Sequence, residues 1–149
     1  MNISLGVDHG ALGLREALLE HLQANGHTVI DHGTHSADSV DYPDYATKVC
    51  DDVNTGKADC GVLCCTTGIG MSMSANKVPG IRAALLHFES EAALTRRHNN
   101  ANVACFGAHH TTPYEACRII DTFLANKFEG GRHERRVHKF CQFENQQSS

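Results

Sequence analysis

The sequence predicts a single α/β domain of three layers, α/β/α, in which helices cover both faces of a five-stranded parallel sheet. Three observations predict it: five short apolar runs, a helical pattern after each run, and a length of 149 residues, which is typical of one domain. Strands that are apolar on both faces must be covered on both sides, and right-handed crossovers place helices there. We therefore treat residues 1–149 as one domain, with a polar tail at about 144–149 that is predicted to be flexible.

The first two strand–helix units occupy residues 2–56. Residues 2–7 (NISLGV) and 27–31 (HTVID) are the predicted strands. The helix after the first strand ends at Gly26 and the helix after the second ends at Gly56, because glycine favours the chain reversal beyond a helix. The apolar positions that repeat at helical spacing are Leu14, Ala17, Leu18 and Leu22 in the first helix and Ala46, Val49, Cys50 and Val53 in the second.

The remaining strands are predicted at residues 60–65, 80–87 and 102–107. The third strand is followed by a glycine-containing loop and by a helix that begins near Met71. The fifth strand is followed by TPYE, in which Thr112 is the predicted N-cap and Glu115 completes a capping box.

The last helix, in the segment RHERRVHKFCQF, has two distinct faces. One is an apolar stripe of Val137, Phe140 and Cys141, and the other is a basic face of Arg132, Arg135, Arg136 and Lys139. A solvated helix surface is the default interpretation of the basic face. The alternative is a clamp that binds a phosphomonoester through its charged groups.

The composition excludes two classes of partner. A formal net charge of -4 at pH 7 argues against a general nucleic-acid binder, which needs a surplus of Lys and Arg. The apolar run at residues 2–7 is interrupted by Asp8 and His9 too early for a signal peptide or a membrane span. We therefore expect a cytoplasmic protein that binds neither nucleic acid nor membranes.

The 7 cysteines and 11 histidines raise the questions of disulfides and metals. The cysteines are odd in number and lie mostly in apolar runs, which favours reduced thiols. No pair has the C-x-x-C or H-x-x-x-H spacing of a structural zinc site, and the adjacent His109 and His110 cannot share one helix face. The sequence therefore predicts no metal site.

The segment CCTTGIGMS, residues 64–72, is the main candidate for chemistry. It follows the third strand, at the edge of the sheet where ligands bind in such folds, and shares that edge with the loops at 8–9, 87–90 and 107–112. Its glycines allow a sharp turn, and the free N–H groups at the start of the next helix can hold a phosphate or an oxyanion. A plain strand-to-helix turn is the alternative interpretation.

Two adjacent cysteines, Cys64 and Cys65, end the third strand. Neighbouring strand residues face opposite sides of a sheet, so only one of the two thiols can face the loop. A thiol beside a helix N-terminus can serve as a base, although packed core cysteine is the commoner alternative. The segments DHG (8–10) and RRHNNAN (96–102) add acid–base groups, for which ordinary hydrogen-bonded loop residues are the alternative.

Five segments together resemble the B-type ribose-5-phosphate isomerases, whose relatives act on allose 6-phosphate and galactose 6-phosphate. The segments are VDHG (7–10), DYPDYA (41–46), TTGIGMSMSANKVPGIRAAL (66–85), RRHNNANV (96–103) and EGGRHERRV (129–137). The resemblance extends from residue 3 to about residue 143. It implies a Rossmann-like sheet with strand order 2-1-3-5-4. It also implies a homodimer, or a tetramer of two dimers, in which the last helix reaches the neighbouring chain and each site is shared.

The resemblance implies interconversion of ribose 5-phosphate and ribulose 5-phosphate through a cis-enediolate, without metal or cofactor. Cys65 stands where the family keeps its base, a position taken by glutamate in another branch, and Cys64 would be a core residue. His98, with Thr67, would assist opening of the furanose ring, and Asp8 and Asn99 would bind hydroxyls. The other implied substrate-binding residues are Tyr42 in the sugar pocket and His9, Arg132 and Arg136 at the phosphate. The loop of Thr66, Thr67, Gly68, Ile69, Gly70, Met71 and Ser72 would also bind the substrate. The amides of this loop from Thr67 onward would stabilise the enediolate.

Two positions depart from the family pattern. Thr66 replaces a glycine or serine, and His109 replaces the arginine of the FG-x-R turn. Arginine is permanently charged and forked, whereas histidine is mostly neutral at pH 7, so the substrate stays open between a pentose phosphate, a hexose 6-phosphate and a tetrulose phosphate. A sugar-phosphate or nucleotide binding module without turnover is a further alternative, which Cys65 and His98 argue against because such a module needs neither.

Overall fold

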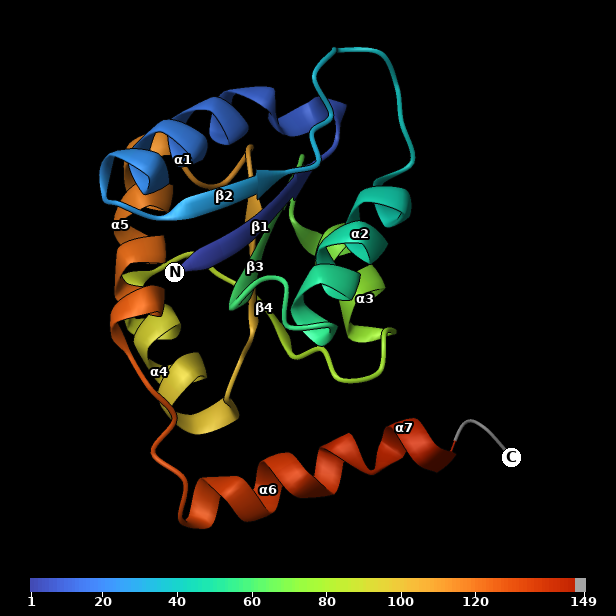
Figure 1. Ribbon diagram of the computed structural model, residues 1–149, viewed down its shortest axis with the longest axis vertical. Helices are drawn as coiled ribbons and strands as arrows, with labels where there is room; N and C mark the ends of the chain where they lie inside the picture. The colour runs from blue at the N-terminus through green and yellow to red at the C-terminus, as the bar shows by residue number, and fades with distance from the viewer. Residues whose placement is uncertain (147–149) are drawn as a thin grey trace.

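Helices cover both faces of a parallel sheet in the computed structural model, which describes residues 1–146 (Figure 1). The strands are β1 (Asn2–Val7), β2 (Thr28–Asp31), β3 (Cys60–Cys65), β4 (Ala83–Leu85) and β5 (Val103–Gly107). Their order is β2-β1-β3-β5-β4, and each neighbouring pair is parallel. The predicted three-layer class and the strand order are both confirmed. Positions 147–149 of the predicted flexible tail lie outside the described residues.

Five helices, α1 to α5, form the two outer layers. The helical segments are the 3-10 helix η1 (His9–Ala11), α1 (Leu12–Ala24), α2 (Tyr42–Asn54), α3 (Ile69–Asn76), α4 (Glu89–Asn99), α5 (Pro113–Ala125), α6 (Arg132–Cys141) and α7 (Phe143–Gln146). Side chains of α1, α4 and α5 pack on one face of the sheet, and those of α2 and α3 pack on the other.

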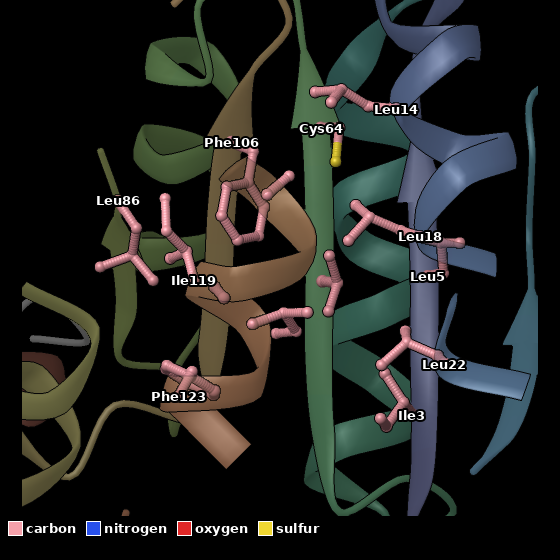
Figure 2. Close-up of a cluster of buried hydrophobic side chains, with 14 of the residues drawn as sticks. Ile3, Leu5, Leu14, Leu18, Leu22, Cys64, Leu86, Phe106, Ile119 and Phe123 are labelled. Atoms are coloured by element: carbon pink, nitrogen blue, oxygen red, sulfur yellow. The ribbon is translucent and has the colours of Figure 1, made fainter. Parts of the chain in front are cut away.

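Two apolar cores lie on the two faces of the sheet. In the larger core, residues such as Leu18 of α1, Phe106 of β5 and Phe123 of α5 are fully buried (Figure 2). In the smaller core, Val49 of α2 and Met71 of α3 pack against the opposite face. Burying a side chain of this size contributes roughly 1.5–3 kcal/mol, so a strand that is apolar on both faces is most stable at the centre of the sheet, where β3 lies.

The fourth strand is shorter than the sequence predicts. It spans residues 83–85 instead of 80–87, because Gly80 has a φ of 85° and the amide of Arg82 donates to the side chain of Asn102 (2.8 Å). Helix α3 begins at Ile69, two residues before the predicted position. Residues 144–146 of the predicted tail are helical and belong to α7.

The capping box predicted for α5 is confirmed. Thr112 Oγ1 accepts a hydrogen bond from the amide of Glu115 (3.2 Å), and the Glu115 carboxylate accepts one from the amide of Thr112 (2.9 Å). The box fixes the end of the loop that follows β5. That loop lies beside the loop that follows β3, because the amide of Ala108 donates to the carbonyl of Cys65 (3.0 Å).

Helices α6 and α7 form an arm below the sheet and its covering helices in Figure 1. Gly130 and Gly131, with φ of 69° and 59°, turn the chain into the arm. In the predicted apolar stripe, Val137 is buried, whereas Phe140 is 38% exposed. The arm therefore leaves apolar surface uncovered. None of the helices within residues 1–146 is both long enough and apolar enough to span a membrane.

Candidate active site

The thiol of Cys65 lies at the carboxyl end of β3, where the chain turns into α3. Its Sγ accepts a hydrogen bond from the amide of Gly68 (3.1 Å). Gly68 has a φ of 76°, and a Cβ at that position would lie 2.8 Å from the carbonyl carbon of Phe106. Only glycine therefore suits this turn, in conformation and in space.

The two neighbouring cysteines have different surroundings. Cys64 belongs to the core beneath α1 and α5, is fully buried, and burial raises the pKa of its thiol far above the ordinary range. Cys65 packs on the opposite face and is 4% exposed. A thiol that stays protonated is a poor base, so Cys64 has a packing role.

The loop after β3 and the first turn of α3 offer backbone N–H groups beside Cys65. The amide of Gly68 is used by the Cys65 sulfur, that of Ile69 by the Thr67 hydroxyl (3.3 Å), and that of Ser72 by the carbonyl of Gly68 (3.0 Å). Within residues 1–146, the amides of Thr67, Gly70 and Met71 have no acceptor. Three of the amides that the family resemblance assigns to an oxyanion are therefore free to bind one.

Asp8 and His9 follow β1 at the same edge of the sheet. The amide of Asp8 donates to the carbonyl of Cys64 (3.1 Å), and its buried carboxylate accepts a hydrogen bond from the amide of Gly10 (2.9 Å). His9 Nδ1 accepts a hydrogen bond from the amide of Val40 (3.2 Å), so its proton lies on Nε2. The Asp8 side chain is thus fixed, and the outer nitrogen of His9 is a donor.

Tyr42 and His109 border the loop on two sides. The Tyr42 ring lies directly over Gly70, where a Cβ would come within 2.6 Å of it, and Tyr42 is 39% exposed. His109 is exposed, and its amide donates to the carbonyl of Thr66 (2.9 Å). The structure therefore brings one group of predicted site residues to the carboxyl edge of the sheet: Asp8, His9, Tyr42, Cys65, Thr66, Thr67, Gly68, Ile69, Gly70, Met71, Ser72 and His109.

The other predicted site residues lie at the opposite edge. His98 and Asn99 are the last two residues of α4, which runs from the carboxyl ends of the strands towards their amino ends. The segment that follows α4 is hydrogen-bonded to the amino end of a strand. The amide of Gly61, in β3, donates to the carbonyl of Asn102 (2.9 Å). Arg132 and Arg136 belong to the arm, which contacts α4 at this edge. One chain therefore does not bring His98, Asn99, Arg132 and Arg136 to Cys65.

A cluster of His98, Glu129 and His133 at the amino ends of the strands was not predicted from the sequence. The rings of His98 and His133 are stacked, and Glu129 Oε2 lies 3.8 Å from His133 Nε2. The i, i+4 spacing of Glu129 and His133 is the one sequence feature that could have predicted a contact within this cluster. One potential ligand atom from each of the three residues lies within 4.8 Å of the others. The parallel rings aim their lone pairs side by side instead of at a common point, so this arrangement does not suit a metal ion.

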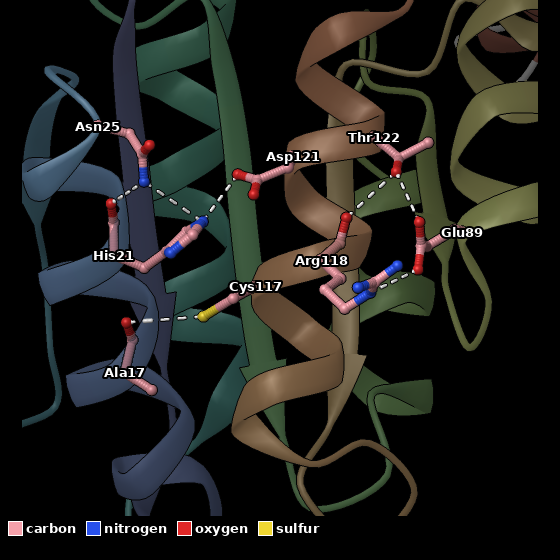
Figure 3. Close-up of polar contacts among 8 residues, drawn as sticks. All are labelled: Ala17, His21, Asn25, Glu89, Cys117, Arg118, Asp121 and Thr122. Atoms are coloured by element: carbon pink, nitrogen blue, oxygen red, sulfur yellow. Dashed lines mark hydrogen bonds and ion pairs between the residues drawn. The ribbon is translucent and has the colours of Figure 1, made fainter.

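A groove of about 480 Å³ between α1 and α5 is separate from both groups of residues. It is bordered by a hydrogen bond between His21 Nε2 and Asp121 Oδ1 (2.8 Å), and nearby Arg118 forms an ion pair with Glu89 (2.8 Å; Figure 3). Burial raises the pKa of the Cys117 thiol in this groove. The contacts join α1, α5 and α4 to one another and offer no activated nucleophile.

Along nearly its whole length, the chain is similar to known sugar isomerases. The model of the Ribose/Galactose Isomerase family matches residues 3–140. A probable ribose-5-phosphate isomerase B of Mycoplasma genitalium is 45% identical, covering 96% of this chain and 95% of that protein. The ribose-5-phosphate isomerase B of Escherichia coli is 42% identical, covering 91% of each.

Solved structures show the same similarity. A structure of Clostridium thermocellum ribose-5-phosphate isomerase B has a TM-score of 0.97 and 43% identity, covering 99% of each chain. The Mycoplasma genitalium enzyme with bound ribulose-5-phosphate has a TM-score of 0.91 and 44% identity, covering 97% of this chain and 96% of that one. The similarity therefore includes both edges of the sheet and the arm.

Proposed function

The chain belongs to the Ribose/Galactose Isomerase family, and on that premise we propose that it interconverts ribose 5-phosphate and ribulose 5-phosphate. The observation that carries the proposal is the hydrogen-bonded thiol of Cys65 beside the free amides of Gly70 and Met71. A base next to preorganised N–H donors suits a reaction that removes a proton from carbon and builds negative charge on oxygen.

In the proposed reaction, the thiolate of Cys65 removes the proton from C2 of the open-chain aldose. The electrons of that C–H bond form the C1–C2 double bond, and the former C1 carbonyl oxygen becomes negatively charged. The amides of Gly70 and Met71 stabilise this enediolate. Return of the proton to C1, with transfer of the O2 hydroxyl proton to O1, gives the ketose. The amides bind the charged intermediate more strongly than the neutral sugar, which is how they lower the barrier.

The aldose must first open its furanose ring. We assign this step to His98, with the Thr67 hydroxyl: the anomeric hydroxyl loses a proton and the ring oxygen gains one. A histidine suits both transfers because its ordinary pKa lies near neutrality. Asp8 and Asn99 are assigned to sugar hydroxyls, Tyr42 to the wall of the pocket, and His9, Arg132 and Arg136 to the phosphate.

These roles require two chains. Cys65 and His98 lie at opposite edges of one chain, so a site that uses both needs a second copy of the chain. We propose a homodimer in which the arm of one protomer brings His98, Asn99, Arg132 and Arg136 to the Cys65 of its partner. The exposed part of the apolar stripe on α6, at Phe140, supports this arrangement because an arm that docks on a partner needs apolar surface.

A related substrate is the second candidate. His109 stands beside Thr66 at the edge that holds Cys65, and it lacks the fork and the permanent charge of the arginine that it replaces. An NMR assay of isomerisation over aldose phosphates of four to six carbons tests both candidates. We expect turnover of ribose 5-phosphate. Turnover of a hexose 6-phosphate or a tetrose phosphate alone would favour the second candidate, and binding without turnover of any sugar would favour a binding module.

A further inference from the structure

The imidazole of His133 lies face to face with that of His98. The ring centroids are 4.1 Å apart and the planes differ by 10°. His98 is near the end of α4, and His133 is in the first turn of α6. The side chain of His98 makes no hydrogen bond within residues 1–146, so the stack is the ring contact that restricts its rotation.

Resting on the proposed function, we propose that His133 is a positioning residue that holds the His98 imidazole in the orientation needed to open the sugar ring. A proton-transfer group must come within about 2.6–3.2 Å of the oxygen that it serves, so a freely rotating imidazole would rarely be placed correctly. A flat, buried neighbour removes this freedom before the substrate binds, as preorganisation requires.

His133 is itself firmly held. It is 7% exposed, and Glu129 Oε2 lies 3.8 Å from its Nε2. Glu129 is tied to α4 twice: its carboxylate accepts from Arg97 Nε (2.6 Å), and its amide donates to the carbonyl of Arg97 (3.1 Å). The same turn of α6 carries Arg132. The stack therefore also fixes the spacing between the ring-opening group and a proposed phosphate ligand.

The geometry favours stacking over a proton relay. The N–H groups and lone pairs of an imidazole lie in the ring plane, so two parallel rings cannot hydrogen-bond to each other. His133 Nε2 is buried and has no hydrogen-bond partner within residues 1–146. Burial lowers the pKa of His133, with His98 and Arg132 acting in the same direction and Glu129 opposing them.

The two directions of the reaction distinguish ring opening from isomerisation. Ribose 5-phosphate is mainly a closed furanose, whereas ribulose 5-phosphate cannot close a furanose because its C5 oxygen carries the phosphate. The ketose therefore enters the site already open, and the aldehyde that it yields closes in water without the enzyme. A defect in ring opening should lower kcat with the aldose and leave kcat with the ketose largely unchanged.

The experiment compares His133→Leu, which fills the buried volume without a flat face, with His133→Phe, which keeps the flat face without nitrogens. The matched control is His138→Ala on the exposed side of the same helix. We expect His133→Leu to lose roughly 10- to 100-fold in kcat with ribose 5-phosphate and less than about 2-fold with ribulose 5-phosphate. His133→Phe and the control should stay within about 3-fold of the parent in both directions.

Equal losses in the two directions for His133→Leu would overturn the proposal, as would a His133→Phe variant that loses as much as His133→Leu. If His133→Leu does not fold, His133→Ala, which also removes the flat face, takes its place: a loss of kcat confined to the aldose direction is expected, and equal losses in the two directions would overturn the proposal. His98→Ala separates this proposal from the proposed function. A direction-selective loss in His98→Ala without one in His133→Leu refutes the positioning role alone, whereas no selective loss in His98→Ala refutes the role given to His98.

Discussion

The Sγ of Cys65 lies 3.1 Å from the amide nitrogen of Gly68, which donates a hydrogen bond to it. This bond ties the last residue of β3 to the turn before α3. Cys64, one residue earlier, has its thiol in the core on the other face of the sheet. The two cysteines therefore give a direct test of the proposed base.

Cys65→Ala should lower kcat by at least about 100-fold, the effect of removing a general base. Cys64→Ala should keep its activity and lose about 1 kcal/mol in free energy of unfolding, because it leaves a small cavity in a packed core. Steady-state kinetics and denaturant unfolding measure the two effects. Similar, mild losses of activity in both variants would contradict the assignment.

The proposed shared site predicts complementation between chains that are each inactive at low substrate concentration. Cys65→Ala lacks the proposed base. Arg132→Ala should chiefly raise KM, because a phosphate is held equally in the ground state and the transition state, so its activity is lost at substrate concentrations well below that KM. When Cys65→Ala and Arg132→Ala chains are mixed and allowed to exchange partners, one of the two sites in a mixed dimer carries neither substitution. Activity should therefore reappear. Mixed dimers verified by mass spectrometry that stay inactive would place both groups in one chain.

His109→Arg tests the departure from the family pattern. A forked, permanent charge beside Thr66 should alter sugar-phosphate binding and change the ratio of kcat/KM between five-carbon and other sugar phosphates by more than ~5-fold, about 1 kcal/mol. His110→Arg, at the next exposed position, is the control for added charge. A ratio that changes equally in both variants would show that position 109 has no specific role.

Gly10→Ala should impair the site without affecting the core. A Cβ at Gly10 would overlap the hydroxyl of Thr66, so the Thr66 side chain in the loop after β3 must shift, whereas a Cβ at Gly13 would meet nothing within 4 Å. We expect at least about a 10-fold loss of kcat/KM for Gly10→Ala, since small misplacements of catalytic groups are costly. Gly13→Ala in α1 should stay active and gain about 0.5–1 kcal/mol in stability. Full activity of Gly10→Ala would show that the loop adapts.

Asp52 should make stability depend on pH. Burial alone would raise its pKa, but hydrogen bonds from His32 Nε2 (2.6 Å) and the buried Ser4 hydroxyl (2.8 Å) lower the pKa below its ordinary value of 3.8. A carboxylate whose pKa is lower in the folded state than in the unfolded state stabilises the fold fully when the pH is above its unfolded-state pKa. That stabilisation is lost as the pH falls through its folded-state pKa. The stability difference between the parent and Asp52→Asn should therefore shrink below about pH 4. Asp51→Asn, exposed on the same helix, is the matched control.

The strands, the order of the helices and the α5 capping box could be predicted because each depends on local pattern. The fourth strand was overextended because its apolar pattern does not reveal that Asn102 binds the amide of Arg82, 20 residues away. The segment around Cys65 could also be predicted, since a strand, a glycine turn and a helix occur there in sequence. The stack of His98 on His133 could not, because it depends on how the arm folds back onto α4.

The position of His98 at the edge opposite Cys65 has a consequence for how the rate varies with protein concentration. Under the proposed shared site, a chain contributes to turnover only while it is paired with a second copy. At concentrations below the dissociation constant of the pair, the rate should rise with the square of the total protein, and only above it in direct proportion. Activity per milligram would then be a measure of self-association, and a dilution series read by turnover would give the pairing affinity without any label.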